Sequence, residues 1–298
     1  MRAIVTGGAG FIGSHVVEAL VARGDEVLVL DDLSRGKREN VPEGARLEVV
    51  DVREPLEFPD ADVCFHLAAQ VDVRVGVERP DFDAEVNVIG TIRVLEAARR
   101  ANAQVVFASS GGAIYGECDG PVGEDAPLQP LSPYGVSKLA GEEYLGAYNR
   151  LYDAGHVSLR YANVYGPRQD PHGEAGVVAI FVGRLAAGER PRIFGDGRQT
   201  RDYVYAGDVA RATLAAVGKR GVFNVGTGVE TSVLELYELC RRVAGSDLEA
   251  EHADARLGEL QRSVLDGSRA ERELGWRAEV GLEEGLRRTW ESFVGPEP

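Results

Sequence analysis

Residues 3–20 read AIVTGGAGFIGSHVVEAL, and this stretch decides the fold. The apolar run at 3–6 predicts a strand, and a helical pattern follows from about residue 11. Between them, glycines stand at 7, 10 and 13 in a G-x-x-G-x-x-G spacing, where G-x-G-x-x-G is commoner. Glycines let backbone N–H groups approach a pyrophosphate closely, and the helix start offers unpaired donors and a positive dipole end. The stretch therefore predicts a strand–turn–helix unit that binds a dinucleotide.

The second predicted strand ends in two carboxylates, Asp31 and Asp32. A carboxylate at this distance after the glycine turn can accept hydrogen bonds from the adenine ribose hydroxyls of NAD. It would repel the additional phosphate of NADP. Arg35, Lys37 and Arg38 follow closely, so NADP tolerance stays open. The carboxylates favour NAD as the cofactor.

The composition is that of an ordinary globular protein, with 298 residues, 44% of them hydrophobic and 27% charged. The formal net charge of −15 argues against nucleic acid and anionic membranes as partners, because both bind basic patches. No apolar stretch reaches the roughly 18 residues of a membrane span, and no signal-peptide pattern is present, so we expect a cytoplasmic protein. Cys64, Cys118 and Cys240 are an odd, scattered set; Cys64 lies in an apolar strand and Cys240 on a helical pattern, so we expect buried thiols rather than disulfide or metal ligands, and we predict no metal site.

The first half of the chain alternates strand and helix patterns. Near-continuous apolar strands suit a parallel sheet that helices cover on both faces. Strands are predicted at 2–6, 26–31, 46–50, 61–67, 104–109 and 156–161, and helices at about 11–23, 81–101 and 135–152. The connection 51–60 is predicted to be a loop because Pro55 and Pro59 interrupt it. The stretch 110–133, rich in glycine and proline, is predicted to be a functional or lid-like loop.

From about residue 164 the predicted elements become shorter. Helices are predicted at 174–187, 206–217, 231–244 and 282–294, and strands at 191–194, 202–205 and 221–225. We therefore predict an α/β fold with two parts. Residues 1–165 form a Rossmann-type, doubly wound parallel sheet that binds NAD, and the chain returns to it around 202–225. Residues 166–298 form a smaller α/β substrate-binding region that closes over the reactive end of the cofactor.

Tyr134 and Lys138 form a Y-x-x-x-K pattern at the start of a predicted helix. At positions i and i+4 they share one helix face. The ordinary pKa of a phenol, about 10, is too high for a base at neutral pH. The Lys138 ammonium and the positive charge of an oxidised nicotinamide would stabilise the phenolate and lower that pKa. The lysine can also hold the nicotinamide ribose. After a dinucleotide turn and five strands, the pair predicts a catalytic base.

Together these motifs resemble the extended short-chain dehydrogenases/reductases and, within that group, the UDP-glucose 4-epimerases. The similarity runs almost end to end, through TGGAGFIGS at 6–14, DDL at 31–33, HLAA at 66–69, FASS at 107–110, YGVSK at 134–138, RYANVYGPR at 160–168 and RDYV at 201–204. The resemblance implies a reaction without net redox change. In it, Tyr134 takes the proton of the sugar 4-hydroxyl while NAD takes hydride from C4. The 4-keto intermediate then turns over and receives hydride on its other face.

The resemblance also implies a set of site residues. Ser110 would hydrogen-bond the sugar 4-oxygen and stabilise its developing charge. Ser109 is the alternative, because counting back from Tyr115 places a glycine at the catalytic position. The implied cofactor-binding residues are Gly7, Gly10, Phe11, Ile12, Gly13, Asp31, Asp32, Ser34, Asp51, Val52, Leu67, Ala68, Ala69, Asn87, Tyr134, Lys138 and Tyr161. The implied substrate-binding residues are Ser110, Asn163, Val178, Ile193, Phe194, Arg201, Arg256, Glu259 and Ser263.

Two of these substrate residues bear on diphosphate and ribose binding. An arginine such as Arg256 presents a planar fork of donors to phosphate oxygens. Glu259 stands where the family usually has an aspartate on the uridine ribose, and its extra methylene distinguishes this chain from that pattern.

Related enzymes on the same scaffold differ at definite positions. Sugar 4,6-dehydratases follow the catalytic threonine with an Asp-Glu pair, and UDP-glucuronate decarboxylases carry a glutamate there, whereas Gly111 and Gly112 follow Ser110 here. Glucuronate 4-epimerases carry arginine where this chain has Asp170, so we expect a neutral sugar. Another nucleotide-sugar enzyme of the superfamily, an NADPH-dependent reductase and a catalytically inactive NAD sensor remain alternatives. Asp31 disfavours the reductase, and the intact Tyr–Lys pair disfavours the sensor.

Two further expectations concern the substrate and the assembly. Ser263 stands where some family members carry a tyrosine that walls off a 2-acetamido group. We therefore expect room for UDP-N-acetylglucosamine, either as a second substrate or as the substrate of a UDP-N-acetylglucosamine 4-epimerase. The family also implies a homodimer in which the helices at about 81–101 and 135–152 form a four-helix bundle with their copies.

Overall fold

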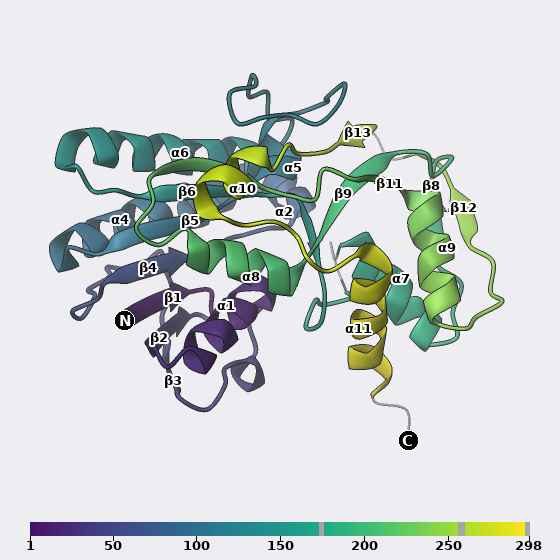
Figure 1. The fold of residues 1–298 in the computed structure, drawn as a ribbon, viewed down its shortest axis with the longest axis horizontal. Coiled ribbons are helices and arrows are strands. Elements are labelled where there is room, and N and C mark those ends of the chain that lie inside the picture. The colour runs from purple at the N-terminus through teal and green to yellow at the C-terminus, as the bar shows by residue number, and fades with distance from the viewer. Residues whose placement is uncertain (173–175, 256–259, 296–298) are drawn as a thin grey trace.

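A computed structural model describes residues 1–172, 176–255 and 260–295 of the chain. Its largest layer is a seven-stranded sheet in which all neighbouring strands run parallel (Figure 1). The strands, in spatial order, are β10 (Gly221–Val225), β6 (Val157–Tyr161), β5 (Gln104–Ser110), β4 (Val63–His66), β1 (Arg2–Thr6), β2 (Glu26–Asp31) and β3 (Ala45–Val49). The order reverses at β1, between β4 and β2. Open α/β sheets bind ligands at such a point, beyond the carboxyl ends of the strands.

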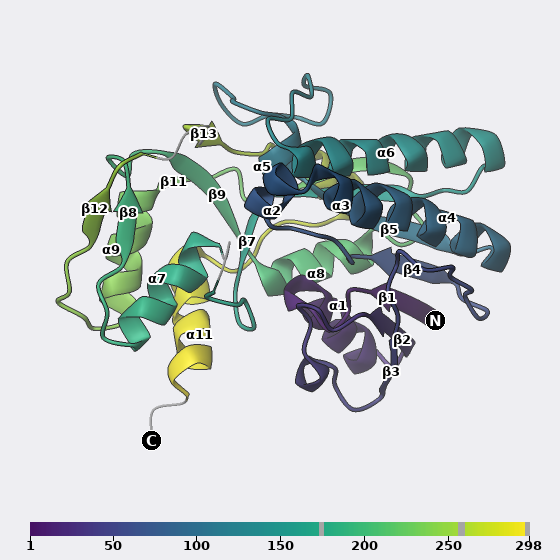
Figure 2. The ribbon, with the colours of Figure 1, turned by 180° about the vertical axis from the view of Figure 1, so that it is seen from behind.

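Helices cover both faces of this sheet, as Figures 1 and 2 show from opposite sides. On one face lie α1 (Phe11–Ala22), α8 (Ala206–Ala215) and α10 (Ser268–Leu274). The other face carries α4 (Gly90–Ala101) and α6 (Pro133–Tyr152), with α2 (Val73–Glu78), α3 (Pro80–Ala84) and a π-helical turn, η2 (Glu85–Ile89), packed beside them. A short 3₁₀ turn, η1 (Arg38–Asn40), follows β2. The fold is therefore the predicted doubly wound α/β sheet.

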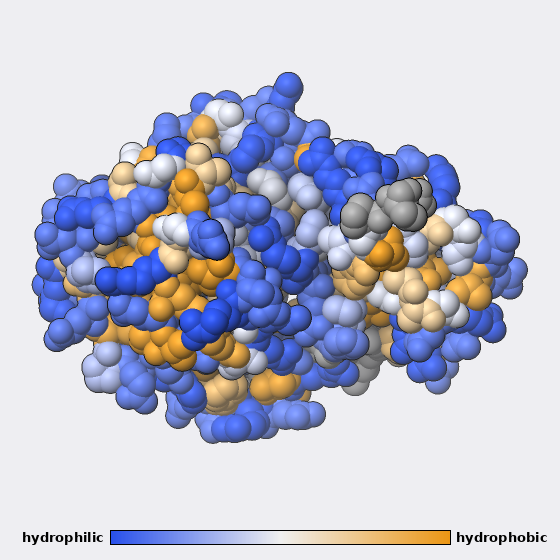
Figure 3. All heavy atoms as spheres, turned by 90° about the horizontal axis from the view of Figure 1, so that it is seen from below, coloured by the Kyte–Doolittle hydropathy of each residue, from blue (hydrophilic) through white to orange (hydrophobic). Residues whose placement is uncertain are grey.

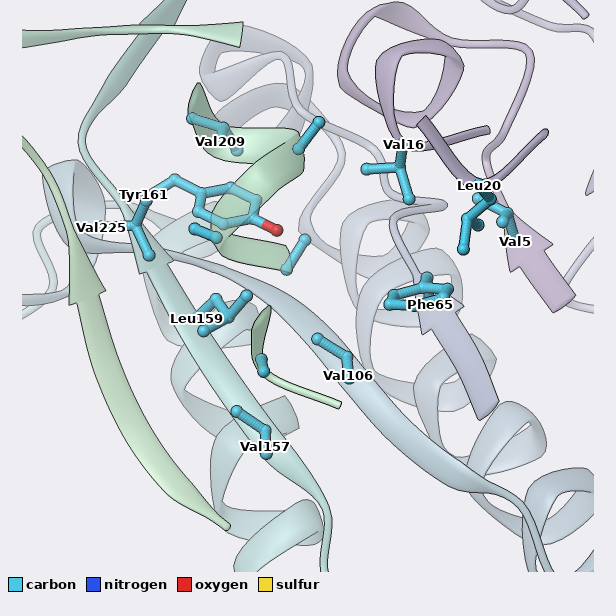
Figure 4. Close-up of a cluster of buried hydrophobic side chains, with 14 of the residues drawn as sticks. Val5, Val16, Leu20, Phe65, Val106, Val157, Leu159, Tyr161, Val209 and Val225 are labelled. Atoms are coloured by element: carbon cyan, nitrogen blue, oxygen red, sulfur yellow. The ribbon is translucent and has the colours of Figure 1, made fainter. Parts of the chain in front are cut away.

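The core divides into two layers because successive strand residues point to opposite faces. On β1, Val5 packs toward α1 and α8, whereas Ile4 packs toward α4. Phe65 on β4 faces the first layer, and Cys64 faces the second. Figure 4 shows side chains of the first layer meeting between strands and helices; those labelled are Val5, Val16, Leu20, Phe65, Val106, Val157, Leu159, Tyr161, Val209 and Val225. Burial of each such aliphatic side chain contributes about 1.5–3 kcal/mol.

The C-terminal half adds a smaller α/β region beside the main sheet (Figure 1). One small sheet joins β7 (Asn163–Tyr165), β9 (Thr200–Tyr205), β11 (Glu230–Ser232) and β13 (Arg262–Ser263), and β8 (Arg192–Phe194) pairs with β12 (Glu251–Ala253). Three helices, α7 (Val177–Ala186), α9 (Val233–Val243) and α11 (Leu282–Val294), enclose a separate apolar core. After β9 the chain returns to the main sheet, where α8 packs on α1 and β10 pairs with β6. Seen from below, most of the surface is hydrophilic, and hydrophobic residues gather in two areas, one in each half (Figure 3).

The helix predicted at about 81–101 is confirmed as one continuous helical run of α3, η2 and α4, and a further helix, α2, precedes it. Asp72 begins α2 by accepting hydrogen bonds from the backbone N–H groups of Arg74 (3.0 Å) and Val75 (3.2 Å), a cap that apolar periodicity does not reveal. Pro80 then starts α3, and η2 precedes α4. The other predicted helices and strands overlap observed ones. The pattern gave no signal for β7, β11, β12, β13 or α10, and residues 174–175 of the predicted helix 174–187 lie outside the described residues.

The segment 110–133, predicted to be a functional or lid-like loop, is anchored to the main sheet. It begins with a short helix, α5 (Gly111–Ile114). Arg160 on β6 donates to the carbonyl of Glu124 (3.0 Å), and the N–H of Asn224 on β10 donates to the Glu124 carboxylate (2.8 Å). The N–H of Val122 donates to the carbonyl of Val264 (3.1 Å). Glycine and proline content predicted the loop but not these anchors, and a functional or lid-like role for it remains a prediction.

Candidate active site

The glycine turn between β1 and α1 leaves no space for side chains at two of its positions. Gly7 has φ +71°, and a Cβ there would lie 2.6 Å from the backbone nitrogen of Ala68. A Cβ on Gly13 would lie 2.1 Å from the carbonyl oxygen of Gly7. The N–H of Gly7 donates to the carbonyl of Leu30 (2.8 Å), which joins the turn to β2. Close packing of backbone against backbone therefore requires glycine at 7 and 13 and presents the start of α1 toward the sheet edge.

A cleft of about 1030 Å³ lies over this turn, at the carboxyl ends of the strands. It extends from the turn to α6 and to α11 of the smaller region. The predicted site residues that line it are Gly7, Gly10, Phe11, Ile12, Gly13, Asp31, Asp32, Ser34, Asp51, Val52, Leu67, Ala68, Ala69, Ser109, Ser110, Tyr134, Lys138, Tyr161 and Asn163. The sequence motifs, which are up to 156 positions apart, from Gly7 to Asn163, thus meet around one cleft.

At one end of the cleft, Asp31 organises the turn. Its two carboxylate oxygens accept hydrogen bonds from the backbone N–H groups of Ala9 and Leu33, each at 2.9 Å. Burial raises the pKa of Asp31, and these two N–H groups oppose the rise. Asp51, also on the cleft, forms an ion pair with Arg53 at 2.6 Å, whose hydrogen bonds lower the pKa of Asp51. Both carboxylates are therefore held in place by partners within the chain.

Asn87 does not line the cleft but holds a segment that does. Its side-chain oxygen accepts from the N–H of Gln70, and its side-chain nitrogen donates to the Gln70 carbonyl, each at 2.9 Å. Asn87 lies in the π-helical turn η2, and such turns are frequent at functional sites. It thereby fixes the end of the cleft-lining stretch 67–70. Its predicted role in cofactor binding remains a prediction.

Lys138 is buried at the inner end of the cleft. Ser132 caps α6 by accepting from the N–H of Gly135 (3.2 Å), and Pro133 occupies the first turn. The Lys138 ammonium donates to the carbonyl of Ala108 (2.8 Å) and lies 4.8 Å from the ring centre of Phe107 and 5.8 Å from that of Tyr134. Burial lowers the pKa of Lys138 to about 8, although the negative charges of Asp83 and Glu142 oppose the fall.

The pKa of Tyr134 in the chain alone lies above that of an ordinary phenol. Burial, with a smaller contribution from the charge of Asp83, raises it to about 12. A hydrogen bond with Ser110 opposes the rise. The chain alone therefore keeps the phenol protonated at neutral pH. The removal of the phenol from water, which a linear pattern does not show, is the largest cause of this rise.

The two candidate serines have different surroundings. Ser109 is buried, and its hydroxyl donates to the carboxylate of Glu142 at 2.5 Å. Ser110 hydrogen-bonds the phenol of Tyr134 and lines the cleft. A side chain at position 111 would meet buried Leu265, since a Cβ there would lie 2.5 Å from its Cδ1. The geometry therefore favours Ser110 as the hydroxyl that faces a substrate.

Most predicted substrate residues outside the main sheet do not line the cleft. Val178 and Ile193 are each 1% exposed, in the core of the smaller region. Phe194 ends β8, and Arg201 on β9 donates to the carbonyl of Thr200 (2.8 Å). Ser263 on β13 is buried, and Arg256 and Glu259 lie outside the described residues. The substrate roles of these residues remain predictions.

Several cleft residues were missed by the sequence reasoning, namely Gln70, Phe82, Arg168, Gln169 and Phe293. Arg168 has the positive φ of +70° and hydrogen-bonds His15 (2.7 Å) and Glu18 (2.6 Å) of α1. It therefore joins the segment after β7 to the helix that begins at the glycine turn. No sequence signal marks this contact. The RYANVYGPR motif marks the segment only.

The parallel sheet, the glycine turn at its reversal point and the Tyr–Lys pair on the same cleft define an extended short-chain dehydrogenase/reductase. The profile of the NAD dependent epimerase/dehydratase family matches residues 3–226, and the chain belongs to this family. It is 50% identical to the UDP-glucose 4-epimerase of Mycolicibacterium smegmatis, over 98% of each chain.

Solved structures agree with this assignment. One is a UDP-glucose 4-epimerase of Thermotoga maritima with UDP-glucose, with a TM-score of 0.95, 45% identity and 98% of each chain covered. Another is the UDP-glucose 4-epimerase of Thermus thermophilus in complex with NAD, with a TM-score of 0.93, 47% identity and 99% of each chain covered. Across the residues described here, no helix is long and apolar enough to cross a membrane, and no cluster of three or more His, Cys, Asp or Glu side chains suits a metal ion.

Replacement of Gly13 by alanine should weaken both the turn and cofactor binding. The added Cβ would overlap the Gly7 carbonyl, so the backbone must shift, at a loss of about 1–3 kcal/mol in unfolding free energy. Denaturant unfolding and NAD titration by calorimetry would measure the two effects. Gly123→Ala is the matched control, because a Cβ there meets nothing within 4 Å. Wild-type NAD affinity in the Gly13 variant would contradict the assignment of this turn.

Proposed function

We propose that this chain catalyses the NAD-dependent epimerisation of a UDP-hexose at C4, interconverting UDP-glucose and UDP-galactose. The observation that carries the proposal is that Tyr134, Ser110 and Lys138 line the same cleft as the glycine turn. The named UDP-glucose 4-epimerases that match the chain at 45–50% identity support the choice of substrate.

The cleft residues fit NAD. At Gly7 and Gly13 neighbouring backbone occupies the space that a Cβ would need. This close backbone packing at a helix start suits a pyrophosphate. Asp31 at the end of β2 suits the adenine ribose hydroxyls. Bound NAD supplies a reversible two-electron oxidation of the sugar C4 carbinol. Lys138 would hold the nicotinamide ribose.

Tyr134 acts as the base that takes the proton of the sugar 4-hydroxyl and later returns it. Ser110 donates a hydrogen bond to the sugar 4-oxygen and so stabilises the charge that develops there. Because burial raises the pKa of Tyr134 to about 12, the phenol becomes an effective base only when further positive charge lies close to it. Lys138 contributes part of that charge, 5.8 Å from the Tyr134 ring centre.

The cleft favours a neutral sugar. Asp170 lines it, and a carboxylate there would repel the carboxylate of a uronate. Gly111 and Gly112 follow Ser110 and offer no acid for the elimination of water. These residues support a 4-epimerase over a dehydratase, a decarboxylase or a uronate epimerase.

A second candidate substrate is UDP-N-acetylglucosamine. A Cβ built on Gly112 would lie 3.5 Å from the side-chain oxygen of Asn163 and 4.0 Å from the hydroxyl of Ser263. These three positions therefore adjoin one another, and all three side chains are small. The small side chains at this corner support the acceptance of a 2-acetamido group.

We also propose a homodimer through the outer faces of α6 and the neighbouring turn η2. Apolar side chains are exposed there, namely Ile89 (44%), Val136 (55%), Tyr144 (41%), Leu151 (71%) and Tyr152 (51%). Pairing of this surface with that of a second copy would remove it from water. Analytical ultracentrifugation tests the assembly, and a monomer at micromolar concentration would contradict it.

Tyr134→Phe should abolish epimerisation while the fold and NAD binding persist. The variant keeps the ring and loses only the group that exchanges the proton, so we expect a loss of about 10²–10⁴-fold in kcat. Incubation with UDP-galactose, followed by chromatography of the sugar nucleotides, measures this loss. Tyr144→Phe, an exposed tyrosine of the same helix, is the control. Residual activity within about tenfold of wild type would require another base.

Ser263→Tyr should discriminate between the two sugars. The tyrosine ring would fill the corner beside Gly112 and Asn163. The rate on UDP-N-acetylglucosamine should therefore fall by roughly tenfold or more relative to the rate on UDP-galactose. Ser263→Ala is the control and should leave the ratio unchanged. Equal rates of wild type and Ser263→Tyr on the N-acetylated sugar would exclude a role for this position in the substrate choice.

A further inference from the structure

Asp83 on α3 is a completely buried carboxylate beside the candidate active site. One oxygen accepts a hydrogen bond from Ser137 (2.5 Å), and the other accepts from the side-chain nitrogen of Gln70 (3.0 Å). Gly76 of α2 closes over the same oxygen, since a Cβ there would lie 3.0 Å from it. Ser137 adjoins Lys138 in sequence and is three residues from Tyr134, and Gln70 lines the cleft. Three elements thus enclose a carboxylate that the catalytic steps above do not use.

The hydrogen-bond donors to Asp83 are both neutral, which distinguishes it from the other acid near Lys138. Glu142, one turn further along α6, forms a buried ion pair with Arg160 at 2.7 Å and also accepts from Ser109. Seen from a distance, the positive charge of Arg160 largely cancels the negative charge of Glu142. Asp83 has hydroxyl and amide partners only, so its field reaches its surroundings uncancelled.

The other titratable groups described near this cluster are either neutral or close to a group of opposite charge. His66 on β4 is held between the hydroxyls of Thr6 (2.7 Å) and Thr91 (3.0 Å), and burial lowers its pKa to about 3, so it is neutral. Asp72, at the start of α2, lies 3.8 Å from Arg35. Around Lys138 the described groups are therefore Asp83, the Glu142–Arg160 pair, neutral His66 and the phenol of Tyr134.

We propose that Asp83 is the buried counter-charge that keeps the Lys138 ammonium protonated, and so acts as a positioning residue for the Tyr134–Lys138 pair. A buried ammonium loses hydration, and a fixed anion in a low-dielectric site restores part of that stabilisation. The Ala108 carbonyl and the rings of Phe107 and Tyr134 supply only partial charges. The value of this charge to catalysis rests on the proposed function, but its effect on Lys138 does not.

The direction of the effect follows from the charges. Burial lowers the pKa of Lys138 to about 8, and Asp83 is the stronger of the two anions that oppose this fall. Removal of its charge destabilises the ammonium relative to the neutral amine, so Lys138 should release its proton at a lower pH. The same removal should lower the pKa of Tyr134, which Asp83 raises.

The chain allows a direct test because it contains only three lysines, Lys37, Lys138 and Lys219. Protein labelled with ¹³C at the lysine Cε gives three NMR signals, which single Lys→Arg variants assign. In wild type the Lys138 signal should titrate well below the other two. In Asp83→Asn its midpoint should fall by about one further pH unit. The alkaline limb of the epimerase pH profile should move in the same direction.

Matched variants separate charge from structure. Asp81→Asn removes an exposed acid of the same helix and should leave the Lys138 midpoint unchanged. Ser137→Ala removes a hydrogen bond but keeps the carboxylate, so its shift should be much smaller than that of Asp83→Asn. Gln70→Lys keeps Asp83 and places a cation against it, and it should lower the midpoint. If Asp83→Asn does not fold, the Lys138 midpoint in Gln70→Lys is the deciding measurement.

Two results would overturn the inference. One is an unchanged Lys138 midpoint in folded Asp83→Asn or, where that variant is unfolded, in Gln70→Lys. The other is an equal shift in Ser137→Ala, which would assign the effect to the hydrogen bonds. A lowered midpoint in a protein whose wild type does not epimerise UDP-galactose would refute the proposed function and leave the counter-charge in place.

Discussion

A buried ammonium is the constraint around which this active site is built. Lys138 lies 4% exposed at the carboxyl ends of the central strands, where an unpartnered cation would be strongly unfavourable. The sheet supplies a carbonyl from β5, α6 supplies a tyrosine ring, and α3 supplies a carboxylate. These groups come from three elements, so the site exists only when the strand order and the helix packing are both correct. The same low-dielectric surroundings raise the pKa of Tyr134, whereas they lower the pKa of Lys138.

The glycine turn and this charged cluster are joined by a buried polar chain. Thr91 donates to the carbonyl of Asn87 (2.7 Å), and His66 bonds both Thr91 and Thr6. The hydroxyl of Thr6 also accepts from the N–H of Ala68 (3.3 Å). Ala68 belongs to the stretch that packs against Gly7. The segment after β4 thus connects the glycine turn to the charged cluster at the other end of the cleft. Fully hydrogen-bonded buried polar networks of this kind rigidify the structure around them.

Local patterns predicted the main sheet and the two ends of the site well. Period and glycine spacing are local properties, so β1, the turn and α1 follow from residues 2–22 alone, and the Tyr134–Lys138 spacing predicts a shared helix face. The features that were missed depend on tertiary contacts. The Asp72 cap begins α2, which no pattern predicted, and η2 forms a π-helical turn within the predicted helix at 81–101. The anchors of Glu124 on the loop 110–133 were also missed. The raised pKa of Tyr134 in the chain alone was also missed, because desolvation is set by neighbours distant in sequence. The lowering of this pKa beside an oxidised nicotinamide remains a prediction.

The central claim is that Tyr134 is the base and gains basicity from positive charge brought close to it. Ultraviolet difference spectroscopy, wild type minus Tyr134→Phe, isolates the ionisation of this one phenol as the pH is raised. Without cofactor the phenolate should appear with a pKa of about 12, and with NAD bound it should appear at a pH lower by at least about one unit. A phenolate that still forms near pH 12 with NAD bound would contradict the account.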